Sequence, residues 1–275
     1  MAANGDNDAW LELCRQAVEA QRAIFAEYSG IEARSHYDGV GEGGDRALVI
    51  DRACEDAVFE LLGAHHQAGN DFVAISEERG EVAFGEGETR VVIDPIDGSL
   101  NARRTIPSHC LSIAVASGES MADVQFGYLY DFGPGEEFIA SLGDGARLGD
   151  AELRTPREPG LEIVGLEATK PERVVAAAER LAGHAYRLRG VGSIAITVAY
   201  VAAGRFDGMI SLRPCRSVDA AAAQLIAREA GAQVRFGDGS LADAPLSLDA
   251  RYPIAAARAE QDMNTLLEAQ RAVPV

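Results

Sequence analysis

The segment Val91-Val92-Ile93-Asp94-Pro95-Ile96-Asp97-Gly98-Ser99 decides how this chain folds. Three consecutive β-branched residues favour a strand that is buried on both faces. Pro95 fixes its own φ and biases Asp94 towards an extended conformation, so we expect the strand to end there in a tight turn. The segment therefore predicts a buried strand that brings two carboxylates, a glycine and a hydroxyl to one place.

The turn has two interpretations. Asp94, Asp97 and the carbonyl of Ile96 would supply three oxygen atoms, which suit a hard cation such as Mg²⁺. Gly98 would let another group approach the backbone closely, and Ser99 would place a hydroxyl beside the metal. The simpler alternative is an acidic turn that ends a strand, because Asp, Pro, Gly and Ser are the common turn residues. The segment alone leaves both alternatives open.

Composition limits the class of protein. With 275 residues and 47% apolar content, the chain can bury one large core or two smaller ones. Its four cysteines form no CxxC pair, so they indicate neither a structural zinc site nor a disulfide framework. Residues 1–7 lack the features of a signal peptide, and no apolar run approaches the length of a membrane span. We therefore expect a cytoplasmic protein with no membrane partner.

The formal net charge of −18 argues against a nucleic acid polymer as partner, because phosphate backbones select basic surfaces. A small phosphorylated substrate is still compatible with this charge, since a bound cation can offset the negative charge of the phosphate.

The first half of the chain mixes helices and strands. Apolar residues at helical spacing predict helices over 8–28 and about 47–66, with a glycine-rich loop at 39–44 between them. Short apolar runs predict strands, and the following are expected to pair in an antiparallel manner: 111–116, 124–130 and 137–141.

Strands and helices alternate in the second half, which is typical of an α/β arrangement. The predicted strands are 161–166, 185–189, 206–211 and 232–236, and the predicted helices are 171–182, 192–203 and 218–230. A proline-rich stretch at 155–160 separates the two patterns. The expected fold class is therefore α/β, with an α+β N-terminal subdomain over 1–155 and an α/β C-terminal subdomain over 156–275.

Three further carboxylates stand at the ends of predicted elements. Glu77 follows a short strand over 73–76, Asp51 lies early in the second helix, and Asp219 begins an alanine-rich helix. Each also has an ordinary explanation. Glu77 would be a solvated loop residue and Asp51 a surface position. Asp219 would complement the helix dipole, with Ser217 as the cap.

Together these residues follow a known pattern in four ordered blocks. Residues 94–99, extended through 107, resemble the Asp-Pro-Ile-Asp-Gly-Thr signature of the inositol monophosphatase family. Residues 76–78 are similar to its Glu-Glu motif, 190–195 to its Val-Gly-Thr-Ala-Ala block, and 218–226 to its Trp-Asp-x-Ala-Ala block. Ser99 replaces the usual threonine, and Val218 replaces the usual tryptophan. The stretches 101–107 and 211–216 look more like the archaeal-type dual inositol monophosphatase/fructose-1,6-bisphosphatase branch.

The resemblance implies a layered αβαβα sandwich of the sugar-phosphatase superfamily, usually as a homodimer. It implies Mg²⁺, about two or three ions per site. The implied metal ligands are Glu77, Asp94, Asp97, Asp219 and the Ile96 carbonyl. Asp51 and Ser99 would orient or deprotonate the attacking water. The implied substrate contacts are Gly98, Ser99 and Ser193. Candidates for binding a second phosphate are Arg104, Arg189 and Arg213, whose alternative is an ordinary surface position.

The function expected from this resemblance is Mg²⁺-dependent hydrolysis of a small sugar or polyol phosphate, of the inositol monophosphate or fructose 1,6-bisphosphate type. One alternative is a phosphatase for a 3′-phosphonucleotide, or for a nucleoside or aminosugar phosphate of one pathway. Another is a metal-binding regulator without catalysis. The complete set of carboxylates argues against the regulator.

Overall fold

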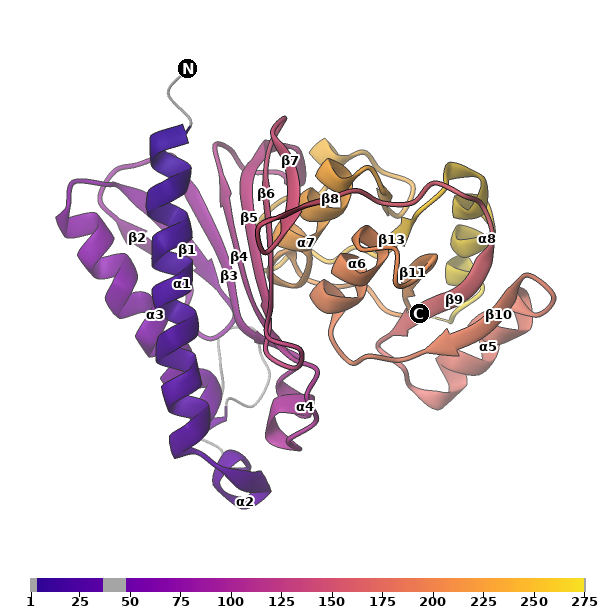
Figure 1. Ribbon diagram of the computed structural model, residues 1–275, viewed down its shortest axis with the longest axis horizontal. Coiled ribbons are helices and arrows are strands. Elements are labelled where there is room, and N and C mark those ends of the chain that lie inside the picture. The colour runs from indigo at the N-terminus through magenta and orange to yellow at the C-terminus, as the bar shows by residue number, and fades with distance from the viewer. Residues whose placement is uncertain (1–3, 37–47, 275) are drawn as a thin grey trace.

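The computed structural model describes residues 4–36 and 48–274 of the chain. Helices and sheets alternate in five layers, which Figure 1 shows side by side. The expected αβαβα sandwich is therefore confirmed, and so is the α/β class. In the described residues, no helix has both the length and the apolar character that crossing a bilayer requires.

The first outer layer consists of α1 (Asn4–Glu27) and α3 (Val49–Gln67). Both helices pack on one face of an eight-stranded sheet with the order β2-β1-β3-β4-β5-β6-β7-β8. Apolar residues at helical spacing form the contact, among them Trp10, Leu13, Val58 and Leu62, and they are buried against Phe72. The periodicity of these residues predicts both helices, within a few residues at each end.

The large sheet is mostly antiparallel, as expected for its middle strands, and only β1 and β3 run parallel. Its strands are β1 (Phe72–Ser76), β2 (Gly80–Phe84), β3 (Arg90–Asp97), β4 (Cys110–Ala116), β5 (Val124–Asp131), β6 (Glu136–Ser141), β7 (Gly145–Leu148) and β8 (Ala151–Leu153). Residues 91–97 of β3 are all buried, because helices cover both faces of the sheet at that strand.

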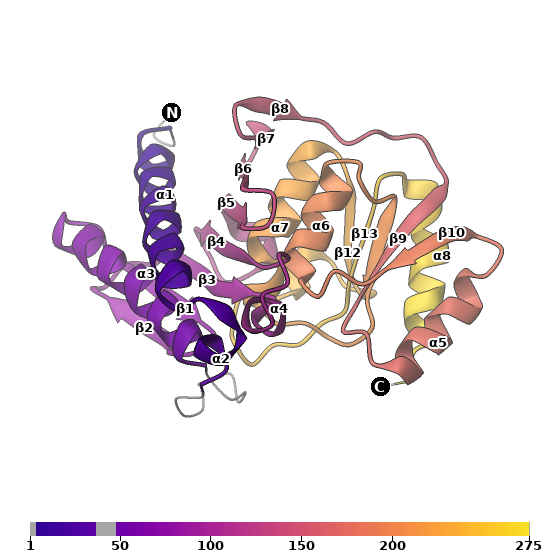
Figure 2. The same ribbon diagram turned by 60° about the horizontal axis from the view of Figure 1, so that its bottom comes forward.

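The middle layer consists of α6 (Ile194–Ala202) and α7 (Ser217–Ala230), which lie between the two sheets (Figure 2). Twelve of the fourteen residues of α7 are buried, and six of those are alanines, at 220–223, 227 and 230. Small side chains let α7 approach both the large sheet and α6 closely, which explains the alanine-rich sequence.

The second sheet has the order β10-β9-β11-β13-β12. Its strands are β9 (Leu161–Glu167), β10 (Ala185–Arg189), β11 (Gly208–Ser211), β12 (Gln233–Phe236) and β13 (Ile254–Ala257). The last layer, α5 (Pro171–Leu181) and α8 (Glu260–Arg271), covers its outer face. Two short helices, α2 (Gly30–Arg34) and α4 (Ser99–Arg103), and two 3₁₀ turns complete the described chain.

Some elements differ from the sequence-based prediction. Strand β3 does not end at Asp94 but continues to Asp97, with a bulge between the two aspartates. The bulge accommodates Pro95, which has no N–H to donate to the sheet. The strands β2, β8 and β13 and the helix α8 were not predicted. The glycine-rich stretch 39–44 lies outside the described residues.

The first sheet ends at Leu153 and the second begins at Leu161, on either side of the expected boundary at 155/156. Both central helices nevertheless come from the second half and pack against the first sheet. The division into two subdomains stays a prediction.

Candidate active site

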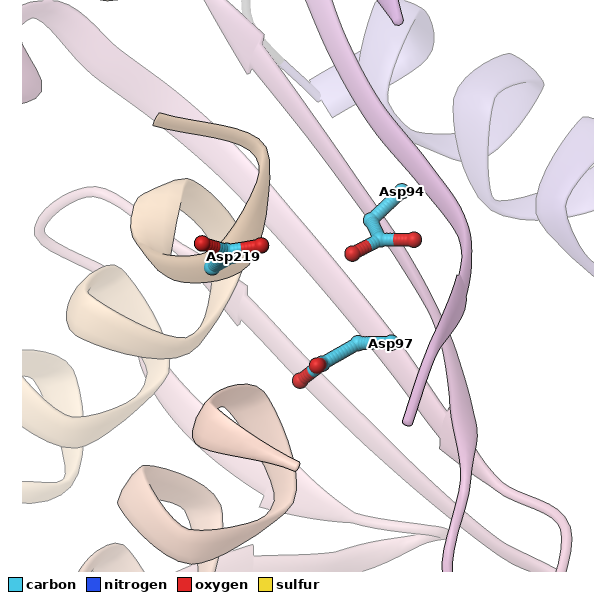
Figure 3. Close-up of side chains that lie close together, drawn as sticks. All are labelled: Asp94, Asp97 and Asp219. Carbon is cyan, nitrogen blue, oxygen red and sulfur yellow. The ribbon is translucent and has the colours of Figure 1, made fainter. Parts of the chain in front are cut away.

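Three aspartates from two distant segments meet at one point. Strand β3 carries Asp94 and Asp97 at its end, and the first turn of α7 brings Asp219 opposite them (Figure 3). One carboxylate oxygen from each residue lies within 4.8 Å of the other two, and all three side chains are buried. The two segments that form this cluster are far apart in the sequence.

The electrostatics of this cluster favour a cation. Burial, followed by the charges of Glu77, Asp97 and Asp219, raises the pKa of Asp94 well above its usual value. Burial and the nearby Asp219 raise the pKa of Asp97 to about 7. Three buried carboxylates this close repel one another unless they are protonated or share a cation, and oxygen donors are the ligands of Mg²⁺. The donor set therefore fits a hard divalent metal.

Asp97 is held in place by the start of α6. Its Oδ2 accepts hydrogen bonds from the Ser193 hydroxyl at 2.6 Å and from the Ala195 N–H at 2.7 Å. Ser193 also caps α6, and it is 1% exposed. Ser193 therefore orients a carboxylate of the cluster, while its expected contact with substrate stays a prediction.

A small cavity joins the other predicted residues to the cluster. Its volume is about 10 Å³, close to that of one water-sized group. The residues that line it are Asp51, Glu77, Glu78, Asp94, Pro95, Ile96 and Ser99. Five of the residues expected to bind metal or water thus surround one space, although they come from three separate segments of the chain.

Asp51 occupies the first turn of α3 and is 7% exposed. Its Oδ2 accepts the Leu48 N–H at 3.2 Å, whereas its Oδ1 has no hydrogen-bond partner among the described residues. Burial raises the pKa of Asp51 to about 7. A buried acceptor without a partner, on a group that titrates near neutral pH, suits a proton acceptor or a binding site for a metal-bound water.

Glu78 is the second glutamate of the motif at residues 76–78, and the sequence predicted no role for it. It lines the same cavity, its Oε2 is buried without a hydrogen-bond partner in the described part of the chain, and burial raises its pKa to about 7. The cavity therefore contains a second carboxylate oxygen that is available to a bound group.

Arg216 is a site residue that the sequence reasoning missed. Its guanidinium lies 2.6 Å from Glu77 Oε1 and 3.5 Å from Asp219 Oδ1. Glu77, predicted as a metal ligand, is therefore ion-paired and is not among the three residues whose oxygens meet within 4.8 Å. An arginine just before the first turn of a helix, where the dipole favours negative charge, was a signal of a special role.

Glu167 is the second missed residue. It is buried at the end of β9, where Oε1 accepts the Val191 N–H and Oε2 accepts the Gly192 N–H, both at 2.9 Å. Thr197 of α6 donates a third hydrogen bond at 2.7 Å. Glu167 therefore fixes the loop that leads into α6 and, through α6, the position of Asp97.

The three predicted arginines are all exposed. Arg104 directly follows α4, and Arg189 ends β10. Arg213 lines a larger cavity that reaches Arg216 and Asp219. Their roles in substrate binding stay predictions.

Comparison with known proteins identifies the family. The model of the inositol monophosphatase family matches residues 6–274. The chain belongs to this family. It is 32% identical over 258 residues to a fructose-1,6-bisphosphatase/inositol-1-monophosphatase of Methanothermobacter thermautotrophicus, covering 88% of this chain and 89% of that protein. It is 30% identical over 270 residues to the protein of the same name from Thermococcus kodakarensis, covering 96% and 98%.

Solved structures of family members agree with this assignment. A crystal structure described as an inositol monophosphatase-fructose 1,6 bisphosphatase superimposes with a TM-score of 0.82 at 26% identity, covering 94% of this chain and 99% of that one. The resemblance to the archaeal dual-type branch is thus confirmed. As a member of the inositol monophosphatase family, the protein is a phosphatase, a hydrolase that acts on small phosphoric monoesters.

Proposed function

We propose that this protein is a Mg²⁺-dependent phosphatase for a small sugar or polyol phosphate, of the inositol monophosphate or fructose 1,6-bisphosphate type. The observation that carries the proposal is the convergence of Asp94, Asp97 and Asp219 at one buried point. The names of the relatives support the substrate class, since they describe phosphatases of both substrates. Homodimer formation and a cytoplasmic location stay predictions.

The residues proposed to hold Mg²⁺ are Asp94, Asp97 and Asp219, with Glu77 and the Ile96 carbonyl as further ligands. When bound, Mg²⁺ would neutralise phosphate charge, acidify a bound water and stabilise the leaving oxygen. For Glu77 to act as a ligand, its carboxylate has to exchange the guanidinium of Arg216 for the cation.

The side chains of this protein would position the reactants. Asp51 Oδ1, which has no partner among the described residues, would accept the proton of the attacking water. Ser99 lines the same cavity and would orient that water. The N–H groups of Gly98 and Ser99, at the start of α4, would donate to the phosphate oxygens. Positioning of this kind supplies most of the catalysis in phosphoryl transfer.

The second anionic group of a bisphosphate would bind an arginine. Arg104, Arg189 and Arg213 are proposed for this role because guanidinium groups bind phosphate through paired hydrogen bonds. Of the three, Arg213 lines the cavity that reaches Asp219.

The test is phosphate release with and without Mg²⁺ over a panel of substrates. The panel contains inositol 1-phosphate, fructose 1,6-bisphosphate, 3′-phosphoadenosine 5′-phosphate, histidinol phosphate and a nucleoside monophosphate. We expect Mg²⁺-dependent release, fastest with one of the first two compounds. Asp94→Asn should abolish release, whereas the exposed Asp150→Asn should not. Full activity of Asp94→Asn would show that the site is wrong, and preference for the nucleotide would overturn the substrate class.

A further inference from the structure

The turn that carries Glu77 lies near the edge of the large sheet. Strands β1 and β2 form an antiparallel hairpin in which Ser76 pairs with Gly80, so residues 77–79 alone connect the two strands. The β1 side of the turn is fixed by β3, whose Ile93 pairs with Ser76. Its β2 side belongs to the edge strand of the sheet. Segments held by few contacts open readily, so this turn needs support from outside the sheet.

Helix α3 supplies that support through Glu55, which is 1% exposed. Its Oε1 accepts hydrogen bonds from the hydroxyl of Ser76 and from the backbone N–H of Arg79, the latter at 3.3 Å. Its Oε2 lies 3.4 Å from Nε of Arg79. One buried carboxylate therefore binds the residues on both sides of Glu77 and Glu78.

The same helix holds the side chain of Arg79 at two further points. The guanidinium forms an ion pair with Asp56 and lies over the ring of Phe59, 4.4 Å from the ring centroid. Both residues follow Glu55 within about one helical turn. The last residue of the turn is thus attached to one short stretch of α3.

A buried carboxylate at position 55 has a cost that packing does not explain. Burial raises the pKa of Glu55, while the hydrogen bond from Ser76, the charge of Arg79 and the backbone N–H groups of the turn lower it. Asp51 lies four residues earlier on the same helix, and two carboxylates at this spacing repel each other. An apolar side chain would fill the same space without either cost. The contacts with the turn therefore explain the carboxylate better than packing does.

The helix and the turn also share the candidate active site. Asp51 of α3 and Glu77 and Glu78 of the turn line the same cavity of about 10 Å³. A displacement of about 1 Å is enough to impair a site whose chemistry depends on the positions of its groups. The distance between α3 and the turn is therefore a quantity that the site requires to be fixed.

We propose that Glu55 is a positioning residue that anchors the turn at 77–79 to α3 and so fixes Glu77 for Mg²⁺ relative to Asp51. Glu55 is not among the residues that line the cavity, so it acts through the turn. With the backbone of the turn anchored, the carboxylate of Glu77 can exchange Arg216 for the cation by a movement of its side chain alone. This inference rests on the proposed function, because it takes Glu77 as a metal ligand.

Mg²⁺ binding without substrate, measured by isothermal titration calorimetry, tests the proposal. Glu55→Gln keeps the shape of the side chain but replaces one acceptor by a donor that faces Arg79. The dissociation constant for Mg²⁺ should rise at least about tenfold, the effect typical of changes to groups that orient metal ligands. Ser76→Ala removes a donor on the turn and should change the constant in the same direction. Glu60→Gln, exposed on the same helix, is the matched control and should bind Mg²⁺ as the wild type does.

Hydrogen exchange in EDTA measures the anchor without any metal. In Glu55→Gln, the amides of residues 77–80 should exchange at least about tenfold faster than in the wild type, because the turn opens more often. The amides of β4 should exchange at the same rate in both proteins, which shows that the variant is folded.

Kinetics with inositol 1-phosphate separate positioning from a general loss of structure. The Mg²⁺ concentration that gives half of the maximal rate should rise at least about tenfold in Glu55→Gln, whereas kcat at saturating Mg²⁺ should stay within about threefold of the wild type. A purely structural role would lower the stability of the variant without changing the Mg²⁺ affinity of its folded form.

Failure of this inference differs from failure of the proposed function. If the wild type binds no Mg²⁺, the proposed function is wrong, and the role of Glu55 is wrong with it. If the wild type binds Mg²⁺ and Glu55→Gln binds it equally well, only the role of Glu55 is overturned. Equal exchange of the turn in the two proteins would also overturn it.

Discussion

Arg216 connects carboxylates from the two halves of the chain. Its guanidinium contacts Glu77, which follows β1, and Asp219, in the first turn of α7. Without a cation, this side chain is positioned to offset part of the repulsion among the buried acids. Breaking a largely buried ion pair by removing one partner is costly because the remaining charge loses its compensation.

The substitution Arg216→Gln tests this role. In EDTA at pH 7, it should lower the free energy of unfolding by about 2 kcal/mol, because Glu77 and Asp219 lose their counter-charge. Mg²⁺ should then stabilise the variant more than the wild type, since the cation replaces the missing positive charge. Urea unfolding with and without Mg²⁺ measures both effects.

Arg213→Gln is the matched control, because Arg213 lies three residues earlier, is exposed and forms none of the ion pairs between described residues. It should change the metal-free stability by less than about 0.5 kcal/mol. Equal stability of the Arg216→Gln variant and the wild type in EDTA would contradict the proposed role of Arg216.

At the residue level, the sequence predicted carboxylates better than it predicted their partners. Asp94 and Asp97 were recognised as candidate ligands from a local pattern of a strand and a turn, whereas Asp219 was assigned as a ligand only through the resemblance to the family. The pairing of Arg216 with Glu77 is not local, since only the packing of α7 against the large sheet brings the two residues together. No periodicity in the sequence encodes that contact.

At the level of elements, the turn from β3 to α4 and the loop before α6 interlock. Gly98 has a left-handed φ of +92°, and a Cβ there would lie 2.9 Å from the Ser108 carbonyl oxygen and 3.2 Å from that of Gly192. Asn101 of α4 donates to the carbonyls of Ser108 and Val191, each at 2.8 Å. The group that approaches the backbone closely at Gly98 is therefore another part of the protein backbone, at Ser108 and Gly192.

The substitution Gly98→Ala should lower the stability of the fold by more than the strain of a left-handed alanine alone would. The φ cost is about 1–2 kcal/mol, and the contact with two backbone carbonyls should raise the total loss of stability to about 3 kcal/mol. Phosphate release should also fall, since the turn carries Asp97 and Ser99. Gly143→Ala is the control, because Gly143 has φ +82° and a Cβ added there would have no described atom within 4 Å. If thermal unfolding shows equal losses of stability for Gly98→Ala and Gly143→Ala, the contact of Gly98 with the two backbone carbonyls contributes nothing to stability.

The substitution Glu167→Gln tests how much the loop before α6 contributes to stability and to substrate binding. A carboxylate accepts both the Val191 and Gly192 N–H groups on separate oxygens, whereas an amide turns one acceptor into a donor. We expect a loss of about 2 kcal/mol in stability and a higher KM, because the loop before α6 loosens. Glu162→Gln on the same strand is exposed and should change neither quantity. An unchanged KM would indicate that the loop does not contact substrate.

The elements that the sequence predicted are those with a clear period. Helix α1 and the strand β4 show regular apolar spacing or a continuous apolar run. Strand β2 is a short edge strand whose Gly80–Phe84 sequence alternates weakly, and β13 is mostly alanine, so neither has a distinctive pattern. Helix α8 does carry a signal, with Met263, Leu266 and Ala269 buried at intervals of three residues.

At the scale of the whole molecule, the site lies where two layers meet. The end of β3 belongs to the large sheet and the start of α7 to the middle helical layer (Figure 2), and one hydrophobic cluster that includes Val92 and Leu225 joins the two layers. The rigid sandwich therefore forces Asp219 against Asp94 and Asp97, although their charges repel. The folding energy of the large apolar cores offsets this local cost.

The cost of burying charged carboxylates predicts how the stability of the metal-free protein depends on pH. Burial raises the pKa of Asp51, Glu78, Asp97 and Glu167 to about 7, well above their values in the unfolded chain. The folded state therefore binds more protons than the unfolded state between about pH 4 and 7. The stabilising effect of these protons is complete below about pH 4 and is lost as the pH rises through about 7.

In EDTA, the free energy of unfolding should thus fall between pH 5 and pH 8, by at least about 2.6 kcal/mol, which is the contribution of one carboxylate whose pKa rises from about 4 to about 7. Mg²⁺ binds only the deprotonated carboxylates, so it should restore stability at pH 8 and have little effect at pH 5. The double variant Asp97→Asn/Glu167→Gln should show a flatter profile, because two of the titrating groups are removed. Urea unfolding at both pH values measures the slope, and a metal-free protein that is more stable at pH 8 would mean that other groups dominate its titration.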